Sequence, residues 1–241
     1  MSQLVIGLGE VGSSILNVLN EHYEDVKGHD QTYTQLDLLG CHQSAFDFFH
    51  ICFPYSDNFV EEVKGYCKDF LKTNGLIIIH STVPIGTCEK LDAVSSPIRG
   101  IHPNLEKGIK TFVKYFGGKR AYEASKIFEA CNIQTKVYDS SRDVEAGKIV
   151  DTAYFGWIVA FNKEIYKMCQ EKGLNFEIVW SEFTKTYNDG YRALDKDKFA
   201  RPYFEHISGP IGGHCVMNNL KFLDNYVSFV LEKINERHKS V

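Results

Sequence analysis

The chain has 241 residues, which allows one large domain or two smaller ones and is ample to bury a core. Its 44% hydrophobic and 24% charged residues exclude a disordered or low-complexity chain, and a net charge of −4 gives no basic surplus for wholesale nucleic-acid binding. The longest apolar run, 153–161, is shorter than the about 20 residues of a bilayer span, so we expect no membrane helix. Seven cysteines without a C-x-x-C pair, behind an N-terminus unlike a signal peptide, predict a cytoplasmic protein with reduced thiols.

The first part of the chain alternates short apolar segments with amphipathic ones. This pattern predicts strands at 3–6, 25–29, 48–53, 76–79, 97–101, 111–116 and 134–138. It predicts helices at 11–20, 58–72 and 119–131. Strands that alternate with helices form a parallel, doubly wound sheet, so the expected class is α/β.

The second part of the chain is predicted to be helical throughout. Helices are expected at 142–171, 176–193 and 218–237, with a Gly/Pro-rich break at 201–213. We therefore predict one domain at 1–140 and a smaller all-helical domain at 141–241. The aromatic side chains of the first of these helices are expected in its core rather than in a stacking site; they are Phe155, Trp157 and Phe161.

A glycine-rich loop joins the first predicted strand to the first predicted helix. Its residues are Gly7, Leu8, Gly9, Glu10, Val11 and Gly12. The spacing G-x-G-x-x-G in this context is typical of a Rossmann-type dinucleotide loop, in which helix N–H groups bind the pyrophosphate. Asp30 ends the second strand, where a carboxylate accepts ribose hydroxyls and repels a 2′-phosphate, which favours NAD over NADP. A turn without a phosphate, or a loop for S-adenosylmethionine, is the alternative.

Residues after later strands are expected at the same edge of the sheet, where ligands bind in doubly wound folds. Phe53, Pro54 and Tyr55 follow the third strand and are assigned to the nicotinamide side of the cofactor. His102 and Asn104 follow the strand predicted at 97–101 and are assigned to the substrate. The alternative for His102 and Asn104 is a rigid turn set by Pro103.

Cys215 closes an unusual segment, Gly209-Pro210-Ile211-Gly212-Gly213-His214-Cys215. The glycines allow a close backbone approach, and the thiol falls just before the expected start of a helix. A thiol at a helix N-terminus is present more as thiolate and is the stronger nucleophile. A turn with a buried cysteine is the alternative.

Four segments together resemble the UDP-glucose/GDP-mannose dehydrogenase family. They are the glycine loop, Ser81-Thr82-Val83-Pro84-Ile85-Gly86-Thr87, Val144-Glu145-Ala146-Gly147-Lys148, and Gly209 to Cys215. Their order and spacing agree with the family across nearly the whole chain. The resemblance implies that an NAD-dependent enzyme oxidises an alcohol to an aldehyde, and that a cysteine then carries the carbon through a thioester.

The resemblance assigns catalytic roles to Cys215 as nucleophile, Lys148 as oxyanion stabiliser and Thr82 as water ligand, and places Ser81 at the cofactor. The resemblance also implies that four further residues contact the substrate: Thr152, Gly212, Gly213 and His214. Three positions depart from the family's acid–base set, because its Glu, Asn and Asp are replaced by Asn104, Thr152 and Asn219. An amide is no general base near neutral pH, so thioester hydrolysis by the family route is in doubt.

The family also has a third domain, for the nucleotide of its sugar substrate, which has no counterpart before Val241. We therefore expect a smaller substrate or a partner chain that supplies this surface, and a homodimer formed by the helical part. The alternatives are an S-adenosylmethionine-dependent transferase on the same scaffold and a catalytically reduced nucleotide-binding protein. No metal site is expected. His42, His50 and Cys52 are close together in the sequence, but His50 and Cys52 share one predicted strand and are expected to point into the packing of the sheet.

Overall fold

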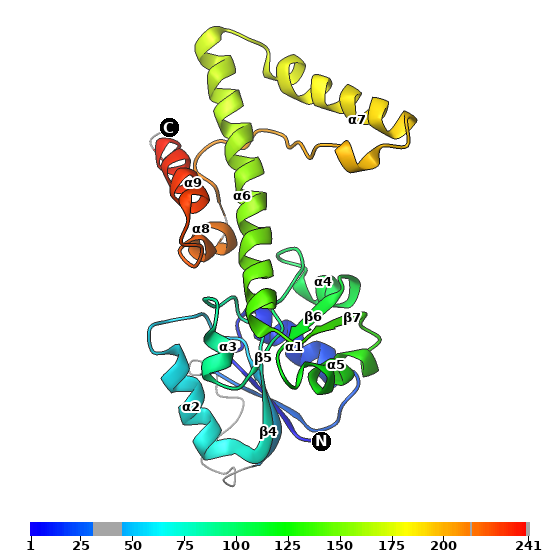
Figure 1. Cartoon of the computed structure of the whole chain (residues 1–241), viewed down its shortest axis with the longest axis vertical. Coiled ribbons are helices and arrows are strands. Elements are labelled where there is room, and N and C mark those ends of the chain that lie inside the picture. Colours follow the sequence, from blue (N-terminus) through cyan, green and yellow to red (C-terminus); the bar gives the residue numbers. More distant parts are fainter. Residues whose placement is uncertain (31–44, 213, 240–241) are drawn as a thin grey trace. The chain divides into compact units, whose positions relative to one another are not determined.

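The computed structural model describes residues 1–30, 45–212 and 214–239 (Figure 1). The chain divides into two compact units, Met1–Lys148 and Ile149–Val241. The division falls close to the predicted boundary at residues 140 and 141. The roles assigned above to two domains stay predictions.

A seven-stranded sheet forms the centre of the first unit, in the order β2-β1-β3-β4-β5-β6-β7. The strands are β1 (Gln3–Ile6), β2 (Val26–His29), β3 (Phe46–Ile51), β4 (Leu71–Ile79), β5 (Val94–Ser95), β6 (Lys114–Gly117) and β7 (Thr135–Tyr138). All neighbouring strands are parallel except β5 and β6, which pair antiparallel at Ser95 and Gly117. The predicted α/β, doubly wound fold is therefore confirmed, with one antiparallel pair that the sequence did not predict.

Helices cover both faces of this sheet (Figure 1). The helices α1 (Glu10–Asn20), α4 (Leu105–Thr111) and α5 (Ala121–Ala130) share one hydrophobic cluster, and α2 (Phe59–Phe70) and α3 (Thr87–Lys90) share the other. Side chains of a strand alternate between faces, so Val5 belongs to the first cluster while Leu4 and Ile6 belong to the second. Burial on both faces explains why these strands are continuously apolar.

One predicted strand of the first unit is wrong, and another begins later than predicted. Residues 97–101 form no strand, and the short strand lies earlier, at β5. Beyond β5 the chain makes only isolated backbone hydrogen bonds to the end of β4, from the N–H of Ser96 to Ile79 and from that of Ile98 to His80. The strand predicted at 111–116 begins only at Lys114. The residues before it form α4, a helix that was not predicted, which ends at Thr111 and buries Leu105 and Ile109.

The second unit is helical, as expected. The long helix α6 (Ser141–Lys172) begins in the first unit and continues into the second. It is followed by the π-helical segment η2 (Glu177–Glu182), α7 (Phe183–Ala193), the 3₁₀ turn η3 (Asp197–Phe199), α8 (His214–Leu220) and α9 (Tyr226–Arg237). Ala153 and Ala160 of α6 pack with Val216 and Leu220 of α8 and with Leu231 of α9. No helix within the described residues is both long and apolar enough to cross a membrane.

Two predictions for this unit are corrected. The helix expected at 218–237 is interrupted, because Asn225 accepts a hydrogen bond from the backbone N–H of Ser228 and so starts α9 with a capping box. The three aromatic side chains expected in the core of α6 are instead exposed by 50%, 37% and 47%; they are Phe155, Trp157 and Phe161. Phe155 makes a ring contact with Phe204, and Phe161 makes one with Trp180.

Candidate functional site

The glycine loop connects β1 directly to α1, and two of its glycines are required by the fold itself. Gly7 has φ +89°, and a Cβ there would lie 2.7 Å from the backbone nitrogen of Phe53. A Cβ on Gly12 would lie 1.7 Å from the carbonyl oxygen of Gly7. These contacts let the helix start immediately above the strand, as the motif predicts.

Gly9 differs from its neighbours because the fold gives no reason for a glycine there. It is the N-cap of α1, with φ −64° and ψ −169°, a conformation open to any residue. A Cβ on Gly9 would meet no atom within 4 Å. No side chain caps the helix start, so no side-chain acceptor serves the backbone N–H groups of the first turn at the N-cap.

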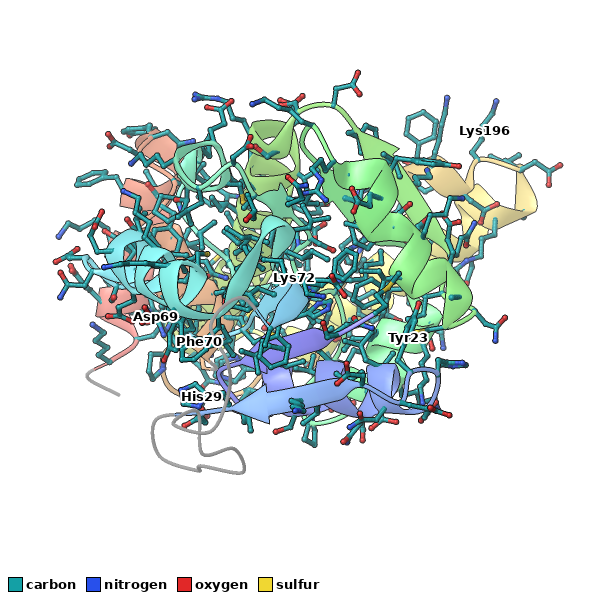
Figure 2. All side chains as sticks on the ribbon, turned by 90° about the horizontal axis from the view of Figure 1, so that it is seen from below. Tyr23, His29, Asp69, Phe70, Lys72 and Lys196 are labelled. Carbon is teal, nitrogen blue, oxygen red and sulfur yellow. The ribbon has the colours of Figure 1, made fainter. Side chains whose placement is uncertain are left out.

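Asp30 lies against this loop. Figure 2 shows Tyr23 near the start of β2 and His29 at its end, one residue before Asp30. The backbone N–H of Leu8 donates to Oδ2 of Asp30 at 2.7 Å. The carboxylate is therefore held beside the glycine loop by the loop's own backbone, in the place where the sequence predicts a ribose contact.

Residues after β3 and β4 join the loop at the same edge of the sheet. The Oγ of Ser81 donates to the carbonyl oxygen of Phe53 at 2.6 Å, and the backbone of Phe53 borders Gly7. The ring of Tyr55 packs against Phe59 with centroids 5.4 Å apart. The structure thus brings together Gly7, Phe53 and Ser81, while Pro54 is exposed and Thr82 is half-buried in the turn that follows.

Glu145 fastens that turn and was given no role by the sequence. It is 2% exposed, and its two carboxylate oxygens accept the backbone N–H of Gly86 at 2.6 Å and of Cys88 at 2.8 Å. A buried carboxylate on two backbone donors is a strong tether. The one sequence signal that could have pointed to Glu145 is its place in the motif 144–148, three residues before Lys148 on α6.

His102 reaches the glycine loop from a distant part of the chain. Its Nδ1 lies 2.7 Å from Oε2 of Glu10, the first residue of α1. Asn104 is the exposed N-cap of α4, and its side chain makes no capping hydrogen bond. Of the two predicted substrate residues, His102 therefore contacts the glycine loop, while Asn104 starts α4.

The remaining candidates divide between the two units. Lys148 is half-buried at the end of the first unit. The second unit holds Thr152, Gly212, Cys215 and Asn219, while Gly213 and the side chain of His214 lie outside the described residues. The catalytic and substrate-binding roles of all these residues stay predictions.

Within the second unit, Cys215 lies inside the first turn of α8 rather than before it. A Cβ on Gly156 would lie 2.4 Å from Cγ1 of Val216, so α8 packs directly on α6. Gly156 is one helical turn from Thr152, whose side chain is 9% exposed. The helix of Cys215 therefore packs on the face of α6 that carries Thr152.

The segment before α8 is held to α6 by buried polar groups. The ammonium of Lys163, 3% exposed, donates to the carbonyl oxygens of Ile207 and of Gly209, the second at 2.8 Å. Asn162 donates to the carbonyl oxygen of Phe204 at 2.6 Å. Burial lowers the pKa of Lys163 from its ordinary value.

A second group of polar residues that sequence analysis missed lies inside the sheet. It runs from Gln3 through His50 and His80 to Lys114, all at most 4% exposed. Nε2 of His50 is 2.9 Å from Oε1 of Gln3, Nδ1 of His50 is 3.0 Å from Nε2 of His80, and Nδ1 of His80 is 3.2 Å from Nζ of Lys114. Nζ of Lys114 also donates to the carbonyl oxygen of Ser96 at 3.0 Å.

Nδ1 of His80 also lies 3.0 Å from the carbonyl oxygen of Ser96, so it either donates to Ser96 or accepts from Lys114. If it accepts from Lys114, Nε2–H of His80 donates to Nδ1 of His50, and Nε2–H of His50 donates to Gln3. Burial lowers the pKa of His50 to about 3 and that of Lys114 to about 7. Burial and the Lys114 charge hold the pKa of His80 well below its ordinary value.

No group of three or more His, Cys, Asp or Glu side chains among the described residues is placed to hold a metal ion. His50 and Cys52 are both buried in the sheet, and His42 lies outside the described residues. Burial raises the pKa of the Cys52 thiol.

Comparison with known proteins places this geometry in context. No family model matches the chain. A UDP-N-acetyl-D-mannosamine dehydrogenase of Methanococcus maripaludis is 23% identical over 95% of this chain and 66% of its own length. The UDP-D-ManNAc dehydrogenase structure from Pyrococcus horikoshii superposes with a TM-score of 0.77 at 17% identity, covering 99% of this chain and 69% of that one.

The chain thus resembles UDP-N-acetyl-D-mannosamine dehydrogenases in sequence, at 23% and 24% identity, and shares the fold of solved UDP-sugar dehydrogenases. It spans about two thirds of the length of the curated relatives it matches, 66% and 61%. A 3-hydroxyisobutyrate dehydrogenase structure from Mycobacterium tuberculosis, at 13% identity and a TM-score of 0.69, is matched over 94% of its length and all of this chain. The resemblance inferred from the four motifs is confirmed, and the fold is one that dehydrogenases of different lengths share.

Proposed function

We propose that this protein is a nicotinamide-dinucleotide-dependent oxidoreductase that uses NAD and oxidises an alcohol or aldehyde of a substrate that is still unidentified. The names of its relatives and structural neighbours, all dehydrogenases in the cases above, support a nicotinamide cofactor. NAD rather than NADP, and the catalytic residues, are the finer parts of the proposal.

The observation that carries the proposal is the construction of the glycine loop. Gly7 and Gly12 are explained by contacts within the protein, whereas Gly9 is not. A glycine at the start of a helix, with space beyond it, is what a pyrophosphate needs in order to approach the backbone. Glu10 and Val11, in the first turn, would donate their N–H groups to the phosphates.

Asp30 supports the choice of NAD. Its carboxylate is fixed by the Leu8 N–H at 2.7 Å, and a carboxylate accepts several hydrogen bonds at once. The same group would receive the adenosine ribose hydroxyls and would repel a 2′-phosphate. Phe53 and Ser81, on the neighbouring strands, would border the nicotinamide half.

A bound nicotinamide ring supplies the hydride acceptor of such a reaction. For the chain's own chemistry we propose Lys148 as the group that stabilises negative charge on the substrate oxygen. Cys215 is proposed as the thiol nucleophile for an aldehyde, with Thr82, Asn104 and Asn219 at the reacting groups. His102, Thr152, Gly212, Gly213 and His214 are proposed as substrate contacts.

Ligand binding tests this proposal directly. Thermal shifts of the purified protein with NAD, NADP and S-adenosylmethionine should show the largest stabilisation with NAD, and NADH fluorescence should rise on binding. A shift with S-adenosylmethionine alone, or no NADH binding at millimolar concentration, would contradict it. Mass spectrometry of any ligand that copurifies is the matching experiment for the substrate.

A further inference from the structure

Three polar bridges tie α1 and its C-cap residue Glu21 to α4 and to the turn before α4. Asn17 Nδ2 is 3.3 Å from Oε2 of Glu106, and Lys110 Nζ is 2.6 Å from Oε1 of Glu21. The third bridge is that of Glu10 with His102. Positions 10, 17 and 21 of a helix share one face, so the bridges form a row along α1. The Glu10–His102 pair stands at the end of the row where α1 begins.

The position of His102 is set by a tight turn. A Cβ on Gly108 would lie 2.6 Å from the Cα of Gly100, so the backbone before His102 packs directly on α4. The N–H of Asn104 donates to the carbonyl oxygen of Ile101 at 2.7 Å within the same turn. The imidazole is therefore held by a folded support and not by a loose surface loop.

The charge of Glu10 conflicts with the proposed use of the glycine loop. Glu10 follows Gly9 directly, and its N–H is among those that would receive a phosphate. A carboxylate on the same residue repels a dinucleotide, whose pyrophosphate carries two negative charges. The Glu10 and His102 side chains are 44% and 47% exposed, so solvent weakens the repulsion without abolishing it.

We propose that His102 sets the affinity of the glycine loop for the dinucleotide by pairing with the Glu10 carboxylate and holding it. This inference rests on the proposed function. His102 then acts on the cofactor site through Glu10, as a positioning residue, in addition to any contact with substrate. Glu10 in turn makes the site dependent on a residue 92 positions away in the sequence.

A double-mutant cycle on NADH affinity tests this coupling. His102→Gln should weaken NADH binding by about three- to tenfold, because it removes the imidazole that pairs with the Glu10 carboxylate and leaves that charge beside the phosphates. Glu10→Gln should bind NADH within about twofold of the natural protein, because the charge is then absent instead of paired. In the Glu10→Gln background, His102→Gln should also change the dissociation constant by less than about twofold, because no carboxylate remains for His102 to pair with.

Two further variants separate charge from structure. His102→Lys places a cation beside Glu10 and should bind NADH nearly as well as the natural protein. Glu21→Gln removes the same charge from the same face of α1, eleven residues further on. That distance, about 16 Å along a helix, exceeds the screening length, so NADH affinity should stay unchanged. Melting temperatures of all variants verify that each one is folded.

The inference is overturned if His102→Gln binds NADH like the natural protein, or if it weakens binding equally with and without Glu10. A folded His102→Lys that binds as poorly as His102→Gln would also overturn it. If the natural protein and all variants fail to bind NADH or NAD, the proposed function itself fails and this inference with it. Weakening by Glu21→Gln would attribute the effect to the packing of α4 and not to the charge at the loop.

Discussion

Lowering the pH should destabilise the first unit long before its carboxylates titrate, because the sheet contains Lys114, His80 and His50 in a single buried chain. The pKa of Lys114 is about 7 in the folded protein and near its ordinary 10.5 when the chain is unfolded. Between these values the unfolded state binds more protons, so stability falls as the pH drops. At about 1.4 kcal/mol per pH unit, the loss from pH 9 to pH 7 is about 3 kcal/mol.

The histidines act in the same direction at lower pH. The pKa of His50 is about 3 in the folded protein and ordinarily 6.5, so its contribution is present above pH 6.5 and is lost as the pH falls. From pH 6.5 to pH 5 this loss is about 2 kcal/mol, and His80 adds to it. Two windows of falling stability are therefore expected, one from Lys114 and one from the imidazoles.

Urea unfolding at pH 9, 7 and 5, followed by circular dichroism and by hydrogen exchange of β3 and β4, measures both windows. Lys114→Met should abolish the change between pH 9 and pH 7 and keep the change below pH 6.5. A flat stability from pH 9 to pH 7, or the same slope in Lys114→Met, would refute the reasoning. If that variant does not fold, NMR of the natural protein decides, because His50 and His80 must remain neutral at pH 5.

Three further outcomes are expected. Asp30→Asn keeps an acceptor for the Leu8 N–H but loses the negative charge. The ratio of NADP affinity to NAD affinity, measured by competition titration, should therefore rise by about tenfold or more. An unchanged ratio would contradict the role of Asp30. Glu145→Ala leaves two backbone N–H groups without their acceptors and should lower the unfolding free energy by about 1–3 kcal/mol, whereas an unchanged melting curve would contradict the tether. We also propose a homodimer. Large aromatic side chains are exposed in the second unit, such as Phe183 of α7 and Tyr154 of α6, each 60% exposed. Light scattering should give twice the mass of one chain, and a monomeric mass would exclude the dimer.

Sequence patterns predicted the parts of the fold that depend on neighbours along the chain. The apolar runs of β1 and β4 and the glycine loop between β1 and α1 were recognised because each is a local signal. The strand predicted at 97–101 does not form, because the segment that pairs with the end of β4 is β5, which consists only of Val94 and Ser95. Local patterns carry no information on that choice.

The candidate site shows the same limit. Gly7, Gly12 and Asp30 were predicted from spacing, and the structure brings them together. Contacts between distant residues were invisible in the sequence, such as Glu145 with the turn at Gly86. The buried histidines were missed for a related reason, since a histidine in a strand gives no sign of its partner.

The pairing of His102 with Glu10 belongs to this class too, because two ordinary surface residues acquire a role only from their juxtaposition. The same holds for Lys163, whose position in α6 gives no hint that it holds the carbonyl oxygens at Ile207 and Gly209. Interactions of this kind need coordinates, since neither charge patterning nor helical spacing singles out the partner.

NADH affinity of the natural protein and of Gly9→Val tests the central claim most directly. A Cβ at Gly9 would meet no protein atom within 4 Å, so the fold should be unchanged, as circular dichroism and the melting temperature can verify. The same side chain would occupy the space in which a pyrophosphate approaches the helix. We predict saturable NADH binding by the natural protein and a loss of at least about tenfold in Gly9→Val. Equal affinity in the two proteins, with both folded, would contradict a dinucleotide site at this loop.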